Sequence, residues 1–173
     1  MSSKQSADIG PLIVKRSRRK TICLMIRPDG SLEVRCPIRL PQSQIEEFIR
    51  QYHGEGIQHI ALACDDIYAT VRQLRARGVR FMDTPDTYYD KVDSRLPGHG
   101  EPLDRLRELR ILIDGAPQDD GILLQIFTDT LIGPIFLEII QRKGNQGFGE
   151  GNFKALFESI EEDQIRRGVL KAQ

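Results

Sequence analysis

The chain has 173 residues, and its 25 Lys and Arg balance its 25 Asp and Glu, so the formal net charge is zero. Hydrophobic residues make up 39% and charged residues 29%, which is typical of a globular protein and excludes a disordered chain. A neutral chain has no general attraction to nucleic acid or anionic lipid, and no apolar run reaches the roughly 20 residues that a membrane span needs. We therefore expect neither nucleic acid nor a membrane as a partner.

The cysteines and the N-terminus bear on the compartment. Cys23, Cys36 and Cys64 are scattered and odd in number, which matches neither a disulfide framework nor the spacing of a zinc site. The first ten residues, MSSKQSADIG, lack the apolar core of a secretory signal. We expect a cytoplasmic protein with reduced thiols.

The first third of the chain predicts a hairpin and a helix. Residues 15–20, KRSRRK, form a basic run without interleaved aromatic residues, which we interpret as a solvated segment. Two β-prone runs flank the Pro-Asp-Gly of residues 28–30, which indicates a hairpin. Residues 41–52 predict a helix, with Ser43 as its N-cap and Glu46 completing a capping box.

The middle of the chain alternates between strand and helix patterns. Residues 57–64 predict a buried strand, and the helix that follows begins after Asp66 as N-cap and is closed by Gly78. Residues 79–83 predict a second strand. The polar stretch 84–109 predicts one or two short helices.

The last third predicts three strands, a glycine-rich loop and a final helix. The strands are expected at residues 110–115, 122–129 and 134–142. The loop spans 143–151, and the helix runs from about Phe153 with Asn152 as its cap and Phe153, Leu156, Phe157 and Ile160 on one face. Taken together, the pattern predicts an α+β fold with helices on one side of a sheet.

Side-chain alternation along the strands predicts a shared wall. Successive side chains of a strand point to opposite faces. One face of the sheet is therefore expected to carry His59, Gln125, Phe127 and Glu138.

Glu138 lies within PIFLEII, a run that is otherwise apolar, and burying an unpaired carboxylate is costly. Together, the His59 imidazole and the Glu138 carboxylate would offer a nitrogen and an oxygen donor to a divalent metal such as ferrous iron. Two plainer alternatives remain open at this point. His59 is a core histidine that binds nothing, or Glu138 forms an ion pair with Arg142 or Lys143.

Several segments together resemble one enzyme family. The segments are GEGIQHIAL, RFMDTPDTYYD, LPGHGEP, ILLQIFT, FLEIIQRKG and GFGEGNFKALFESIEEDQIRRGVL. In this order they resemble the C-terminal part of 4-hydroxyphenylpyruvate dioxygenase over about residues 41–173. The resemblance implies a vicinal-oxygen-chelate fold (glyoxalase/dioxygenase-like), built from βαβββ modules, with a C-terminal helix as a lid.

The resemblance also implies an activity and its residues. The family uses Fe(II) and O2 to convert the aromatic 2-oxo acid 4-hydroxyphenylpyruvate to homogentisate and CO2, a step of tyrosine and phenylalanine catabolism. His59 and Glu138 correspond to iron ligands, and no catalytic residue beyond the metal ligands is implied. The residues that correspond to substrate contacts are Gln44, Gln125, Phe127, Phe148 and Phe153.

The chain departs from the family at its N-terminus. The first histidine ligand of the family comes from a preceding module that this sequence lacks, so we expect a truncated or chimeric chain with little turnover of its own. We divide it into residues 1–40, a basic segment and hairpin of open origin, and residues 41–173, the dioxygenase module. Residues 12–49 also resemble the start of a YgjP-type zinc metallopeptidase domain, although its His-Glu-x-x-His helix is missing.

Two further alternatives follow from this departure. Hydroxymandelate synthase is a near relative that the same residues fit, so the product is homogentisate or hydroxymandelate. The other is a module that is non-catalytic, or a dimeric metal-binding module in which two copies pair and each lends His59 and Glu138 to a shared site. We accordingly expect a homo-oligomer.

Overall fold

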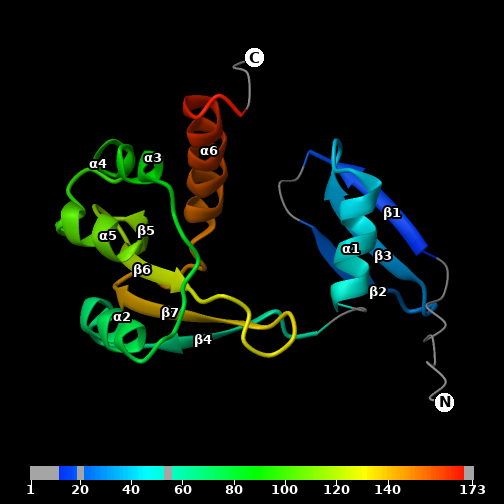
Figure 1. The fold of residues 1–173 in the computed structure, drawn as a ribbon, viewed down its shortest axis with the longest axis horizontal. Coiled ribbons are helices and arrows are strands. Elements are labelled where there is room, and N and C mark those ends of the chain that lie inside the picture. Colours follow the sequence, from blue (N-terminus) through cyan, green and yellow to red (C-terminus); the bar gives the residue numbers. More distant parts are fainter. Residues whose placement is uncertain (1–11, 19–21, 53–55, 170–173) are drawn as a thin grey trace. The chain divides into compact units, whose positions relative to one another are not determined.

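The computed structural model describes residues 12–18, 22–52 and 56–169. They fall into two compact units that divide between Ile57 and Gln58 (Figure 1). The sequence places the boundary after residue 40, ahead of a helix that the structure groups with the N-terminal unit. Each unit has its own hydrophobic cluster.

The N-terminal unit is a three-stranded sheet with one helix. Its elements are β1 (Leu12–Ser17), β2 (Cys23–Ile26), β3 (Leu32–Pro37) and α1 (Gln42–Tyr52), and the strand order is β1-β3-β2. The predicted hairpin is confirmed, because β2 and β3 are antiparallel. The sequence analysis missed β1, which pairs parallel to β3 and takes up the first part of the basic run.

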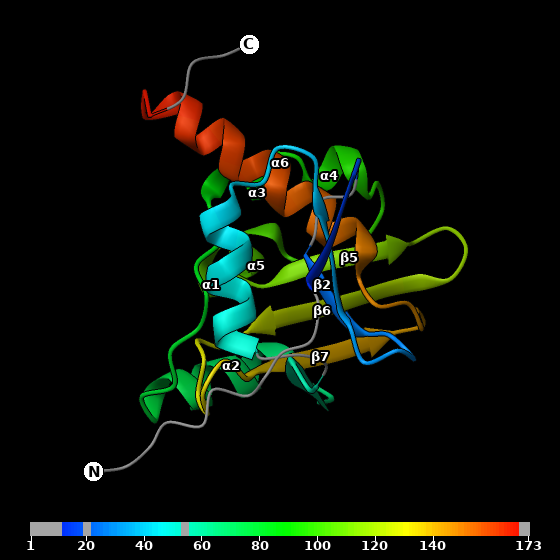
Figure 2. The same cartoon turned by 90° about the vertical axis from the view of Figure 1, so that its right-hand side faces the viewer.

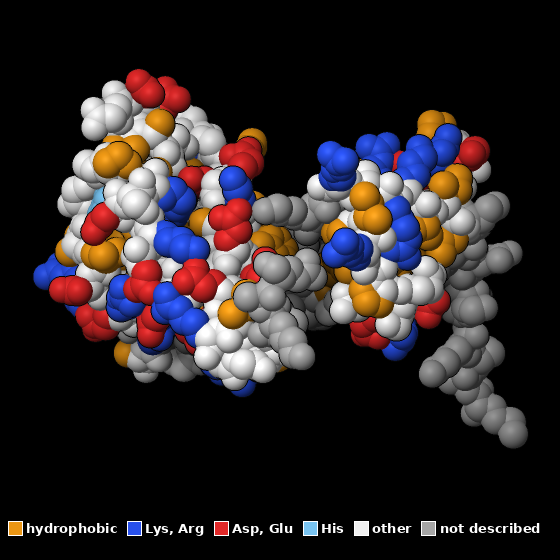
Figure 3. Space-filling model, turned by 90° about the horizontal axis from the view of Figure 1, so that it is seen from above, with side chains coloured by type: hydrophobic (Ala, Val, Ile, Leu, Met, Phe, Trp, Pro, Cys, Tyr) orange, Lys and Arg blue, Asp and Glu red, His pale blue; other side chains and the backbone are white. Residues whose placement is uncertain are grey.

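A buried carboxylate organises the charges of this unit. The side chain of Glu33 is 3% exposed, and its oxygens lie 3.0 Å from Lys15 Nζ, 3.1 Å from Arg27 Nη1 and 2.6 Å from Arg35 Nε. Hydrogen bonds from Arg35 and Lys15 lower the pKa of Glu33 to about 2. In Figure 3, Lys and Arg side chains are more prominent than Asp and Glu side chains on the visible face of this unit. Part of the basic run therefore has a structural role rather than being merely solvated.

Helix α1 begins earlier than its sequence signals indicate. Gln42 is already helical, and the backbone amide of Ile45 donates to the carbonyl of Pro41. Ser43 thus lies inside the first turn, so its prediction as N-cap is wrong. Ile45 is fully buried against the sheet, as its apolar stripe predicts.

The C-terminal unit is a four-stranded sheet with helices. The elements are β4 (His59–Ala63), α2 (Ile67–Ala76), α3 (Asp86–Tyr89), α4 (Val92–Arg95), α5 (Leu103–Leu109), β5 (Leu112–Ala116), β6 (Gly121–Phe127), β7 (Phe136–Lys143) and α6 (Glu150–Arg166). The strand order is β4-β7-β6-β5, in which β4 is parallel to β7 and the remaining pairs are antiparallel. Figure 2 shows β5, β6 and β7 side by side. This is the predicted α+β architecture, a βαβββ module followed by a helix.

The predicted boundaries of α2 are confirmed. The carboxylate of Asp66 accepts a hydrogen bond from the amide of Ala69 at 3.0 Å, which is the geometry of an N-cap. The helix ends at Ala76, and Gly78 follows with a φ of +87°. Gln141 of β7 also bonds to the start of this helix, since its Oε1 accepts from the amide of Ile67 at 3.1 Å.

Two predictions for the connecting segments are wrong in detail. Residues 79–83 form no strand, only an isolated bridge between Phe81 and Thr128. The segment 84–109 contains three short helices rather than one or two.

The start of the last helix also differs from the prediction. Helix α6 begins at Glu150 after Gly149, so Asn152 is not its cap. Asn152 is 1% exposed, and its side-chain oxygen accepts a hydrogen bond from Tyr88 instead. Asparagine favours helix caps and buried hydrogen bonds alike, and the sequence alone does not separate the two roles.

The core of the C-terminal unit lies between one face of the sheet and the short helices. Its buried members include Ile67 and Val71 of α2, and Tyr88 and Tyr89 of α3. From the strands it takes Ile113, Leu124, Ile126 and Ile139. The opposite face of the same strands carries the residues of the candidate functional site. Within the described residues, no helix combines the length and apolarity needed to cross a membrane.

Candidate functional site

The face of the sheet that lies opposite the core, here called the wall, brings the predicted residues together. Strand register fixes its composition, because directly paired residues point to the same side. Ala61 is paired with Glu138, which is paired with Phe127 on its other side. Gln125 is paired with Ile140 on one side and Leu112 on the other. His59, Gln125, Phe127 and Glu138 therefore share one face, as predicted.

His59 and Glu138 meet on adjacent strands. The Nε2 atom of His59 lies 3.4 Å from Oε2 of Glu138. The side chain of Glu138 is 9% exposed and that of His59 is 39% exposed, because β4 is the edge strand. The pair thus has a buried carboxylate and an imidazole that is open to an incoming group.

Glu138 has an unusual electrostatic environment for a carboxylate. Burial raises its pKa, and the charges of His59 and Arg142 oppose that rise only in part. Arg142 uses Nη1 to donate to the carbonyls of Asn145 and Gly147, at 3.0 and 2.7 Å. Lys143 pairs with Glu101 at 2.6 Å. Neither cation forms the predicted ion pair with Glu138, so that alternative is wrong.

Aromatic side chains continue the wall beside the pair. The ring of Phe136 stacks on His59 with centroids 5.3 Å apart, and it meets Phe127 edge-on at 5.8 Å. Phe136 was not singled out in the sequence, although its position two residues before Glu138 places it on the same face. This cluster fixes the orientation of the imidazole and gives the site an apolar, aromatic side.

Gln125 occupies the centre of the wall. It is 1% exposed, and its Oε1 has no hydrogen-bond partner among the described residues. Gly149 passes directly over it with a φ of +74°, and a Cβ at that position would collide with the Gln125 amide. The glycine thus permits the start of α6 to approach the wall.

The structure places the other predicted substrate residues less centrally. Phe148, in the loop before α6, is 79% exposed, and Phe153 in its first turn is 45% exposed. Gln44 is exposed in α1 of the N-terminal unit, and its role in the site stays a prediction. The predicted apolar face of α6 is not buried either, since Phe157 and Ile160 are 47% and 37% exposed.

Asp114 is a wall residue that the sequence analysis missed. It lies opposite Leu123 in the β5–β6 pairing, and its Oδ2 accepts a hydrogen bond from the amide of Gly151 at 2.7 Å. Its place on the wall follows from alternation along β5. Its link to α6 could not be read from the sequence, because it depends on how the helix docks.

The donor set of the wall fits part of a metal site. An imidazole nitrogen and a carboxylate oxygen at 3.4 Å can bind one divalent ion together after a small adjustment. Across the described part of the chain, no group of three or more His, Cys, Asp or Glu side chains is arranged to hold a metal. The wall therefore supplies two donors of a site that needs a third.

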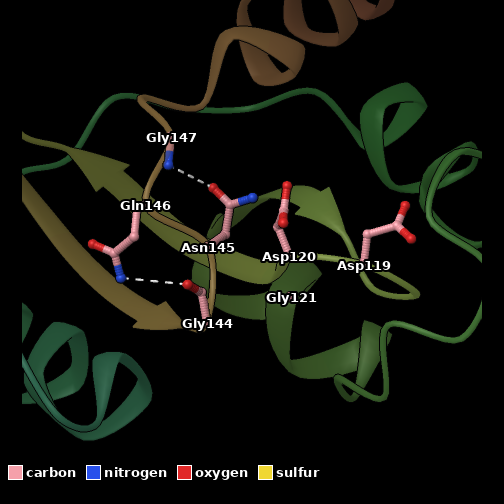
Figure 4. A pocket seen from close by; sticks show the side chains of 7 residues that line it. All are labelled: Asp119, Asp120, Gly121, Gly144, Asn145, Gln146 and Gly147. Atoms are coloured by element: carbon pink, nitrogen blue, oxygen red, sulfur yellow. Dashed lines mark hydrogen bonds between the residues drawn. The ribbon is translucent and has the colours of Figure 1, made fainter.

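A separate hollow lies at the other end of the β6–β7 pair. Asp119, Asp120, Gly121, Gly144, Asn145, Gln146 and Gly147 line it (Figure 4). Its side chains bond mainly to their own loop: Asn145 Oδ1 accepts from the amide of Gly147 at 2.8 Å, and Gln146 Nε2 donates to the carbonyl of Gly144 at 3.3 Å. Gly121 starts β6 and Phe127 ends it, so this hollow is distinct from the site at His59 and Glu138.

Comparisons with known proteins agree with this architecture. Residues 6–94 match the model of the family described as the Glyoxalase/Bleomycin resistance protein/Dioxygenase superfamily. A 4-hydroxyphenylpyruvate dioxygenase of Pseudomonas aeruginosa is 84% identical over 74% of this chain and 36% of its own length. Hemolysin VllY of Vibrio vulnificus is 75% identical over 84% of this chain and 41% of its own length.

A solved structure shows the same similarity. A mutant of 4-hydroxymandelate synthase from Streptomyces coelicolor aligns with a TM-score of 0.60 and 36% identity, over 83% of this chain and 41% of its own. The chain thus spans about two fifths of the length of the relatives that it matches.

The comparisons also resolve the two family resemblances. The match over residues 6–94 includes all of residues 12–49, so the resemblance of that stretch to a metallopeptidase domain is not borne out. The resemblance to 4-hydroxyphenylpyruvate dioxygenase is confirmed by relatives of that name. The chain belongs to the Glyoxalase/Bleomycin resistance protein/Dioxygenase superfamily.

Proposed function

We propose that this chain forms the C-terminal part of the site of a 4-hydroxyphenylpyruvate dioxygenase and supplies two of its Fe(II) ligands, His59 and Glu138. The observation that carries the proposal is the 3.4 Å approach of the two side chains on a wall that also presents Gln125 and Phe127. Relatives that bear the dioxygenase name support it at up to 84% identity.

The two ligands have complementary properties. Glu138, held in place by burial, offers a charged oxygen donor, and binding a cation offsets the cost of that buried charge. His59 offers a nitrogen donor from the edge strand, and its ring is steadied by Phe136. Ferrous iron would supply the reactivity toward O2 that amino-acid side chains lack.

The remaining wall residues would bind and orient the substrate. The reaction consumes 4-hydroxyphenylpyruvate and O2 and yields homogentisate and CO2. Gln125 would orient a polar group of the substrate once the start of α6 moves off it, because its carbonyl oxygen is buried under Gly149 and has no hydrogen-bond partner among the described residues. Phe127 would contact its aromatic ring. Helix α6 and the loop before it, with Phe148 and Phe153, would close over the site and exclude water.

The pathway and the compartment that we propose follow from membership of the same family. We assign the chain to tyrosine and phenylalanine catabolism in the cytoplasm, and its free Cys23, Cys36 and Cys64 agree with a reducing compartment. Residues 41–173 would form the dioxygenase module. The third ligand would come from another module or from a second copy of this chain in a homo-oligomer.

Hydroxymandelate is a second candidate product, and a solved structure supports it. The aligned 4-hydroxymandelate synthase shares 36% identity, so hydroxymandelate is the alternative product of the same site. The two activities differ in where oxygen enters the substrate. Product analysis therefore separates them directly, with 4-hydroxyphenylpyruvate as the common substrate.

Anaerobic titration with Fe(II), with the oligomeric mass measured on the same sample, tests the proposal. We expect iron binding that is lost in His59→Ala and in Glu138→Gln. Glu101→Gln is the matched control, because its carboxylate is also buried, at 7% exposure, but pairs with Lys143 away from the wall. This variant should keep its iron.

The outcomes separate the alternatives. One iron per dimer would assign a site shared between two copies, and turnover of 4-hydroxyphenylpyruvate would then be measured on the dimer. One weakly held iron per monomer would mean that the third ligand lies in another module. Equal iron binding by the wild type and both ligand variants would refute the assignment of His59 and Glu138.

A further inference from the structure

A buried polar network, here called the α6 anchor, joins the start of α6 to the edge of the sheet. Its centre is the hydroxyl of Tyr88 in α3. This hydroxyl lies 2.5 Å from Oδ1 of Asn152 and 3.0 Å from the carbonyl of Ile113, either of which can accept its proton. It also accepts from the backbone amide of Ile113 at 3.0 Å. One oxygen thus joins α6 to β5.

Arg95 of α4 reinforces this centre from the side. Its Nη2 donates to the Tyr88 hydroxyl and to the carbonyl of Ile113, both at 2.8 Å. Its Nη1 lies 3.5 Å from Oδ1 of Asp114, whose other oxygen accepts from the amide of Gly151 at 2.7 Å. A second connection therefore runs from Arg95 through the wall residue Asp114 to the first turn of α6.

The centre of the anchor is shielded from water. Tyr88 and Asn152 are each 1% exposed, and the Arg95 guanidinium lies over the Tyr88 ring at 5.2 Å from its centroid. Burial raises the pKa of Tyr88 to about 12, so the hydroxyl keeps its proton over the physiological range. Hydrogen bonds of this kind are costly to remove, because the groups left behind cannot turn to solvent.

The anchor lies next to the residues that define the site. Gly149, against the Gln125 amide, comes two residues before Gly151, and Phe153 directly follows Asn152. Within this short segment, the backbone has little freedom once Gly151 and Asn152 are held. The hydrogen bonds of Tyr88 in α3 and Arg95 in α4 therefore bear on how closely α6 approaches the wall.

We propose that Tyr88 and Arg95 are positioning residues of the site, because they hold Asn152 and Gly151 and thereby fix the start of α6 over Gln125. Neither residue belongs to the sheet, and their action on a substrate would be indirect. Their role in orienting substrate rests on the proposed function, whereas their hold on α6 does not.

The neighbouring residue Tyr89 makes a matched control available. Tyr89 is as buried as Tyr88, yet its hydroxyl lies near Thr84 and makes no hydrogen bond to Asn152, Ile113 or Arg95. Tyr88→Phe removes the hydroxyl at the centre of the anchor, and Tyr89→Phe removes one that does not belong to the anchor. Both keep the aromatic ring in the core.

Hydrogen exchange of the full chain, followed in peptides from residues 149–160 and from β6, tests the anchor. In Tyr88→Phe we expect exchange in 149–160 to rise about tenfold, the effect of losing the one hydrogen bond of this hydroxyl that reaches α6, while β6 is unchanged. Tyr89→Phe should match the wild type in both regions. Equal exchange of 149–160 in both variants, or a uniform rise that includes β6 in Tyr88→Phe, would overturn the proposal.

A second arm separates this inference from the proposed function. Exchange is repeated with Fe(II) and 4-hydroxyphenylpyruvate under anaerobic conditions. Protection of 149–160 in the wild type that is weakened in Tyr88→Phe would support the positioning role. Equal protection in the two proteins would refute that role. A wild type that gains no protection would instead count against the proposed function, and the comparison without ligand would still decide whether the anchor holds α6.

Discussion

Replacing Gly149 with alanine should destabilise the C-terminal unit for two separable reasons. The residue has a φ of +74°, and a left-handed backbone costs an alanine about 1–2 kcal/mol. The new Cβ would also collide with the amide of Gln125, which is 1% exposed and has little room to move. Overpacking of this kind costs roughly 1–3 kcal/mol, so the total is about 2–5 kcal/mol.

Gly78→Ala provides the control for the backbone contribution alone. Gly78 has a φ of +87°, and nothing lies within 4 Å of the position that a Cβ would take. Its replacement should cost only the first part, about 1–2 kcal/mol. Urea unfolding of both variants, followed by circular dichroism, gives the difference between them as the contribution of the contact with Gln125.

A double variant makes this test sharper. In Gln125→Ala the amide is absent, so adding Gly149→Ala should cost no more than Gly78→Ala does. The coupling between residues 125 and 149 should then reach about 1 kcal/mol or more, as for other side chains in contact. Equal unfolding free energies for Gly149→Ala and Gly78→Ala, together with no coupling, would refute the reasoning that α6 is seated on Gln125.

Three further predictions concern charges and caps. Glu138→Gln should be at least as stable as the metal-free wild type at pH 8, because burial raises the pKa of Glu138 and the variant avoids the cost of its buried charge. The difference in unfolding free energy should shrink as the pH falls, since protonation removes that charge from the wild type. A variant that is less stable than the wild type in urea at pH 8 would contradict this. The pKa of Glu33 is lowered to about 2, so the Glu33 carboxylate stabilises the N-terminal unit fully above its ordinary pKa of 4.5. This stabilisation is lost as the pH falls from 4.5 toward 2. Thermal melts should show the loss in the wild type and not in Glu33→Gln. Asp66→Ala should cost about 1 kcal/mol in urea unfolding by removing the N-cap of α2, while Asp65→Ala should cost clearly less.

Side-chain alternation made the wall predictable from the sequence. The period of two along a strand is a property of the backbone, so the shared face of Gln125 and Phe127, or of Phe136 and Glu138, follows once a strand is recognised. The meeting of His59 with Glu138 required in addition that β4 lie beside β7, which the family resemblance implied. The Asp66 cap was equally predictable, because its signal is local.

The misses share a physical cause, which is dependence on a distant partner. The first residues of the basic run lie in strand β1, which pairs with β3, and Lys15 forms an ion pair with Glu33 of that strand. Asn152 is held inside by Tyr88 rather than capping a helix. For α6, the apolar stripe indicated which side chains share a face but not what covers them, and Phe157 remains exposed. None of these partners lies within a few residues in the sequence.

The parallel pairing of β4 with β7 has a consequence for the order of folding. The β5–β6 and β6–β7 pairs join strands that are neighbours in the sequence, and such contacts form early at a small entropic cost. Strand β4 ends at Ala63, whereas β7 begins at Phe136, so their pairing must close a loop that contains most of the unit. His59 reaches Glu138 only after the intervening chain has condensed. The candidate site thus reports on completed folding, and nascent or partly unfolded molecules would lose the pair before they lose the rest of the sheet.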